Sequence, residues 1–183
     1  MENIYLFILI ALVLLAFADL IVGVSNDAVN FLNSAIGSKV LSFKTLMIIA
    51  SLGVFVGCVY SSGMMEVARK GIFNPGEFLF NEIMIIFMAV MITDILILDL
   101  FNSWGLPTST TVSIVFELLG ASVAMALIKI GVDNGSFTDL ATYINTSKAT
   151  QIILGILLSV FVAFSIGAIA VSYTHLTLPT TYG

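Results

Sequence analysis

The stretch IYLFILIALVLLAFADLIVGV (Ile4–Val24) decides the fold class, because its length and apolar character suit a helix that crosses a bilayer. A bilayer core is about 30 Å thick, and a helix of roughly 20 mostly apolar residues spans it. Comparable runs follow along the chain. We expect about five transmembrane helices of this length, at Ile4–Val24, Thr45–Met65, Phe78–Leu100, Pro107–Ile130 and Thr150–Ala170.

The composition supports the same class. Of 183 residues, 60% are hydrophobic and only 9% are charged, which is typical of an integral membrane protein. The apolar runs do not alternate with polar residues, so they favour helices over the strands of a membrane barrel. The sequence therefore predicts an all-α, multi-pass protein of the cell membrane. We expect the lipid bilayer as its environment and no nucleic acid among its partners.

A polar stretch, SNDAVNFLNSAIGSK (Ser25–Lys39), follows the first apolar run directly. On a helical period Asn26, Asn30 and Asn33 share one face. This pattern predicts a short broken or re-entrant helix, separate from the first span, whose polar side faces a cavity. The oxygens of Asn26, Asp27 and Asn30 suit a small hard cation. A simple cap at the membrane interface is the alternative.

A second polar stretch is NSWGLPTSTT (Asn102–Thr111). Gly105 and Pro107 break the preceding helix, and proline fits the first turn of a new one. The hydroxyl residues 108–111 would then lie where free backbone N–H groups point outward. A helix N-terminus with added hydroxyl donors suits a tetrahedral oxyanion without a lysine. Hydroxyls that only bond to backbone or join helices are the alternative.

Carboxylates inside apolar spans are costly, and they indicate function more often than elsewhere. Asp94, Asp99 and Glu117 have such positions, and Asp19 does so more weakly. We expect Asp94 and Glu117 to line an ion path, with a structural pair as the alternative for Glu117. Glu82 is expected at an interface, and Glu66–Glu77 reads as an exposed loop.

Together the two polar stretches resemble the inorganic phosphate transporter family. SNDAVNFLNSAIGS (Ser25–Ser38) is similar to its Asn-Asp-x-x-Asn signature, and GLPTSTTVSIV (Gly105–Val115) to its Gly-Leu-Pro-x-Ser-Thr-Thr motif. The resemblance runs over essentially all of residues 1–170. It implies cation-coupled symport of inorganic phosphate by two inverted repeats, each with both motifs. The chain would then be the first repeat, lacking a C-terminal repeat and unable to transport by itself, and a homodimer is one assembly to expect.

The resemblance also implies roles for single residues. Asn26, Asp27 and Asn30 match the signature associated with sodium and phosphate binding. The hydroxyls that hold phosphate match Ser109, Thr110 and Thr111, and we add the Asn30 amide to this set. No cofactor is expected beyond the transported Na⁺ or H⁺ as coupling ion. No nucleophile and base are arranged as an enzyme would need, so we expect no enzymatic activity.

The chain departs from the family pattern at four positions. Asn33 stands where many members have glycine, Val112 where many have histidine, and Phe116 and Glu117 where they have small residues. A site without histidine favours sodium as the coupling ion, whereas Glu117 keeps proton coupling open. The alternatives are a proton-coupled phosphate or sulfate permease, or a membrane helix bundle that transports nothing.

The last residues, VSYTHLTLPTTYG (Val171–Gly183), break the apolar pattern. They resemble the translation of a transposase adapter used in sequencing libraries. We therefore expect residues 1–170 to be the transporter's N-terminal half and residues 171–183 to be a non-native tail that contains the only histidine, His175. A short native tail is the alternative.

Overall fold

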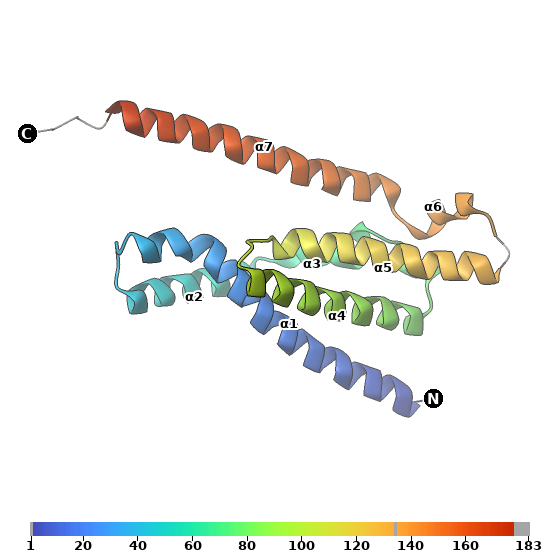
Figure 1. Cartoon of the computed structure of the whole chain (residues 1–183). Coiled ribbons are helices and arrows are strands. Elements are labelled where there is room, and N and C mark those ends of the chain that lie inside the picture. Colours follow the sequence, from blue (N-terminus) through green and yellow to red (C-terminus); the bar gives the residue numbers. More distant parts are fainter. Residues whose placement is uncertain (1, 134, 178–183) are drawn as a thin grey trace, which may run out of the picture. The chain divides into compact units, whose positions relative to one another are not determined.

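The computed structural model describes residues 2–133 and 135–177, and every regular element in that part of the chain is a helix (Figure 1). The longer helices are α1 (Glu2–Gly37), α2 (Phe43–Val59), α4 (Phe80–Trp104), α5 (Thr110–Val132) and α7 (Thr146–Thr177). Shorter helical turns connect them, at α3 (Ser62–Glu66), η1 (Val67–Gly71), η2 (Pro75–Glu77), η3 (Phe137–Asp139) and α6 (Leu140–Tyr143). The chain forms two compact units, Met1–Thr146 and Ser147–Gly183.

Among the described residues, 4 helices are long and apolar enough to cross a membrane, namely α1, α4, α5 and α7. The apolar helix α2 is shorter, with 17 residues. At 1.5 Å per residue α2 is about 26 Å long, slightly less than the bilayer core of about 30 Å. The predicted all-α membrane fold is confirmed, although the second predicted span stops at Val59 instead of Met65.

The polar stretch after Val24 is not a separate short helix, as the sequence suggested. It continues the first span, so that α1 runs unbroken for 36 residues from Glu2 to Gly37. Figure 1 shows that α1 changes direction along its length, and its second half lies beside α2. Closely spaced glycine and serine residues, here Gly23 and Ser25, are common where helices bend. The Ser25 hydroxyl also donates to the Ile21 carbonyl at 2.7 Å, a bond that often bends a helix.

The core of the first unit lies among α1, α4 and α5. Ile86, Val90, Asp94 and Leu98 form one buried stripe on α4, at the four-residue spacing that keeps side chains on one helix face. Helix α5 has a matching buried stripe, made of Leu118, Ser122, Ala126 and Ile130. The carboxyl group of Asp94 is therefore part of a core that is otherwise almost entirely apolar.

Residues 66–77 are not the exposed loop that the sequence suggested. Ile72 and Phe73 are each 1% exposed, and Phe73 forms a β-bridge with Ile144. The backbone N–H of Asn74 donates to the Tyr143 carbonyl at 2.8 Å. This segment therefore folds back onto the connection that follows α5.

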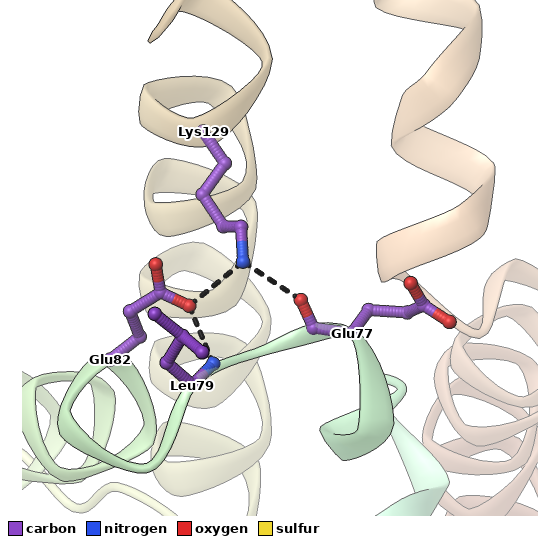
Figure 2. Close-up of polar contacts among 4 residues, drawn as sticks. All are labelled: Glu77, Leu79, Glu82 and Lys129. Carbon is purple, nitrogen blue, oxygen red and sulfur yellow. Dashed lines mark hydrogen bonds and ion pairs between the residues drawn. The ribbon is translucent and has the colours of Figure 1, made fainter. Parts of the chain in front are cut away.

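An ion pair joins the start of α4 to the last turns of α5 (Figure 2). The Lys129 ammonium donates to Glu82 Oε2 and to the Glu77 carbonyl, both at 2.9 Å. Glu82 Oε2 also accepts from the Leu79 N–H at 2.7 Å, which caps α4. Glu82 thus lies at the end of a span, as expected for an interfacial residue, and it fixes this end of the α4–α5 pair.

Helix α7 continues through Ala170 to Thr177, beyond the predicted end of the native sequence. The expected adapter-derived tail begins inside this helix at Val171. The side chain of His175 and residues 178–183 lie outside the described part of the chain. The origin of this segment stays a prediction.

Candidate functional site

The second motif forms the turn between α4 and α5. Helix α4 ends at Trp104 and is capped by Gly105, whose φ of 67° lies in the left-handed region that glycine adopts without strain. Helix α5 begins only at Thr110, and the Ser109 hydroxyl caps it by accepting from the Val112 N–H at 3.4 Å. The new helix therefore starts three residues later than the sequence suggested, and Pro107 and Thr108 precede it.

The asparagines of the first motif bond across to this turn. Asn26 is only 3% exposed, and its Nδ2 donates to Asn102 Oδ1 at 2.8 Å. Asn30 Nδ2 donates to Asn26 Oδ1 at 3.2 Å and to the Thr108 carbonyl at 2.6 Å. The side-chain amides of Asn26, Asn30 and Asn102 thus form an amide network. It connects α1 with the end of α4 and with the turn before α5.

Asp27 and Thr110 form a second link between the motifs. The Thr110 hydroxyl lies 3.1 Å from Asp27 Oδ1 and 3.2 Å from Oδ2, and it donates to the carboxylate across 83 residues of sequence. Hydrogen bonds to charged acceptors are stronger than neutral ones. This contact places Asp27, the predicted cation ligand on α1, against the N-terminal turn of α5, which is the predicted anion site.

A cavity of about 620 Å³ opens beside the amide network. None of its lining residues is charged, and they are Asn26, Val29, Asn30, Asn33, Ser34, Asn102, Gly105, Leu106 and Pro107. The lining mixes amide donors and acceptors with an apolar surface. Such a cavity can hold a small polar solute through directed hydrogen bonds.

The predicted phosphate ligands are not all gathered around this cavity. Thr110 and Thr111 line a smaller one of about 110 Å³, on the side of α5 that faces Ala68 and Ile72. The Ser109 hydroxyl serves as the helix cap. Of the predicted anion ligands, only Asn30 faces the larger cavity, so the ligand roles of the three hydroxyls stay predictions.

Asn102 belongs to the site, although sequence reasoning did not single it out. Its signal was its place at the start of the second polar stretch, three residues before Gly105. An asparagine near a helix end is common for local reasons, so its bond to Asn26 could not be read from the sequence.

The intramembrane carboxylates divide into two groups. Asp94 is 2% exposed, and its side chain lies within hydrogen-bonding reach of both Asp19 and Glu117. The Ser113 hydroxyl donates to Glu117 Oε1 at 2.7 Å. Asp99, in contrast, is exposed on α4. Asp94 and Glu117, both expected to line an ion path, thus lie close together, with Asp19 as a third member, and the ion path itself stays a prediction.

The phosphate transporter family matches residues 23–181. The chain belongs to this family. The resemblance drawn from the two motifs is thereby confirmed, and the protein is a multi-pass membrane protein of a transporter family.

Relatives named "Putative phosphate permease" come from several organisms. The one from Thermococcus kodakarensis is 28% identical over 137 residues, which are 74% of this chain and 30% of the relative. The one from Pyrococcus furiosus is 30% identical over 118 residues, or 63% of this chain and 29% of the relative. The one from Helicobacter pylori is 30% identical over 105 residues, which are 56% of this chain and 20% of the relative.

The chain thus spans less than a third of the length of these relatives. No solved structure matches the chain significantly.

Proposed function

We propose that this protein carries inorganic phosphate across the cell membrane and couples its movement to sodium. The contact between Asp27 and Thr110 is the observation that supports this most strongly. It joins the two motifs in space, so that the predicted cation ligand Asp27 lies against the N-terminus of α5. The family and the names of the relatives support phosphate as the cargo.

Sodium has a clear electrostatic task in this arrangement. Phosphate is an anion, and the carboxylate of Asp27 would repel it in a low-dielectric site. A sodium ion on Asp27, with Asn26 and Asn30 oxygens as further ligands, would cancel that repulsion. Phosphate would then accept hydrogen bonds from the N-terminal turn of α5 and from the Asn30 amide, where it would replace the Thr108 carbonyl as acceptor. The two ions would thus bind together more tightly than either alone.

Transport also requires that the site open to each side of the membrane in turn. In the proposed mechanism a second, inverted repeat completes the site, and one repeat moves against the other around the bound ions. A second copy of both motifs downstream of this sequence would supply that repeat. A homodimer of the complete protein stays a further prediction.

The test is uptake of labelled phosphate into proteoliposomes that contain the full-length protein. An inward sodium gradient should drive uptake, whereas an equal potassium gradient should not. Uptake driven equally by both would remove sodium from the mechanism. Inhibition by excess unlabelled sulfate as strong as that by unlabelled phosphate would reassign the cargo, and no uptake under any gradient would overturn the proposed function.

A further inference from the structure

We propose that Asp19, Asp94 and Glu117 form a proton-binding site inside the α1–α4–α5 bundle, separate from the Asp27–Thr110 site. Each helix contributes one carboxyl group, and the carboxyl group of Asp94 interacts with those of the other two. The site is deeper in the bundle than the motifs. Eight residues of α1 separate Asp19 from Asp27, and seven of α5 separate Glu117 from Thr110, or about 10–12 Å of helix in both cases.

One oxygen atom in each residue of this carboxyl cluster lacks a donor. Asp19 Oδ1, Asp94 Oδ1 and Glu117 Oε2 are buried, and no described group donates a hydrogen bond to any of them. Buried polar atoms are almost always paired, because an unpaired one costs roughly 1–3 kcal/mol. Asp94 is the decisive member, because it is only 2% exposed and its carboxyl group interacts with those of both Asp19 and Glu117.

No described cation neutralises these groups. On α1, α4 and α5 the other titratable side chains with described positions are Asp27, which bonds to Thr110, the exposed Asp99, the Glu82–Lys129 pair, and the exposed Tyr5, whose ring lies against Phe80. Lys129 lies twelve residues from Glu117, or about 18 Å along the helix. Lys70, in the turn η1, is exposed and pairs with Glu66.

A proton fits this arrangement better than a metal ion. Two carboxyl groups at hydrogen-bonding distance attract each other only when one of them holds a proton, as carboxyl pairs in other sites do. In the described part of the chain, no group of three or more acidic, histidine or cysteine side chains is placed to hold a metal ion. A shared proton supplies the missing donor and lowers the charge of the cluster.

The proton would also connect this site to the proposed transport site. Without it, the carboxylates would repel one another in a low-dielectric core and push α1 away from α4 and α5. The same helices carry Asp27 and Thr110, whose bond needs α1 and α5 close together. Protonation of the cluster therefore favours the arrangement in which the two motifs meet.

The direct test is infrared spectroscopy of the full-length protein at neutral pH, where protonated carboxyl groups show a distinct carbonyl stretch. The wild type should show this band, Asp94→Asn should lose it, and Glu117→Gln should shift or weaken it. The control Asp99→Asn, on the same helix but exposed, should keep it. If Asp94→Asn fails to fold, Glu117→Gln decides alone, since Glu117 is only half-buried.

A wild type without the band, or a band unchanged in Asp94→Asn and Glu117→Gln, would overturn the proposal. So would loss of the band when sodium replaces choline at constant pH, because sodium would then be the occupant.

A second experiment, which rests on the proposed function, compares phosphate uptake by the wild type and by Glu117→Gln at several pH values. When the pH is raised above neutral, the uptake rate of the wild type should fall by a larger factor than that of the variant. Equal losses would remove the link to transport, while the infrared result would still decide proton binding. Failure of the proposed function would appear instead as absent uptake in the wild type.

Discussion

The hydroxyl of Thr110 on α5 donates to the carboxylate of Asp27 on α1, at 3.1 Å and 3.2 Å from its two oxygens. The two residues are 83 positions apart, and each belongs to a different motif. Their contact holds the polar second half of α1 against the first turn of α5. It is the structural basis for treating the two motifs as one site.

Thr110→Val should weaken the coupling ion's site, because it removes the donor that orients Asp27 while keeping the side-chain shape. A hydrogen bond to a charged group contributes about 1.5–3 kcal/mol, so half-maximal uptake should need roughly 10- to 150-fold more sodium. Thr110→Ser keeps the hydroxyl and should stay close to wild type. If Thr110→Val and Thr110→Ser needed the same sodium concentration for half-maximal uptake, the Thr110–Asp27 bond would have no role in ion binding.

Asn102→Leu should damage the amide network, although Asn102 is itself exposed. Asn26 would lose its acceptor while 3% exposed, and an unpaired buried amide costs about 1–3 kcal/mol. We expect a lower melting temperature and a higher phosphate KM. The neighbouring Ser103→Ala, also exposed, is the control and should change neither value. A KM equal to that of wild type in Asn102→Leu would argue against the cavity as a phosphate site.

The Glu82–Lys129 pair should show measurable coupling in a double-mutant cycle of Glu82→Gln and Lys129→Met. Its side chains are only 16% and 20% exposed, and Lys129 also lies over the rings of Phe78 and Tyr143. We expect a coupling of about 1 kcal/mol in chemical unfolding. The Glu66–Lys70 pair is the matched control, because its side chains are 62% and 68% exposed and screening leaves such pairs little energy. Equal coupling in both cycles would contradict this ranking.

Gly23→Leu should impair both folding and uptake, because Gly23 is where α1 comes close to the other two core helices. A Cβ at this position would lie 3.9 Å from Leu98 and from Thr110, which is ordinary contact, so Gly23→Ala should be tolerated. A leucine would be forced into both neighbours. Gly53→Leu on α2 meets open space and serves as the control. A Gly23→Leu protein with normal stability and uptake would show that α1 does not pack here as described.

The sequence predicted the apolar helices and the family correctly, because both follow from local patterns and motifs. It predicted a break after Val24 because amides and serines weaken helices, but their cost per residue is small and no proline interrupts residues 25–36. The helix therefore continues to Gly37.

Other features depend on contacts between distant residues. Phe73 stands two residues before a Pro-Gly turn, which suggested an exposed loop, and only its bridge to Ile144 explains its burial. The bond between Asn26 and Asn102 joins residues 76 positions apart. Asp19 joined the carboxyl cluster for the same reason, since no spacing rule connects α1 with α4 and α5.

Sodium-driven uptake of labelled phosphate by the Asp27→Asn variant, in proteoliposomes of the full-length protein, tests the central claim most directly. Asparagine keeps the size of the side chain and removes its charge, and Asp99→Asn controls for loss of an exposed carboxylate on a core helix. The account predicts that Asp27→Asn loses sodium-driven uptake while Asp99→Asn retains it. Sodium-driven uptake by Asp27→Asn equal to that of the wild type would contradict the account.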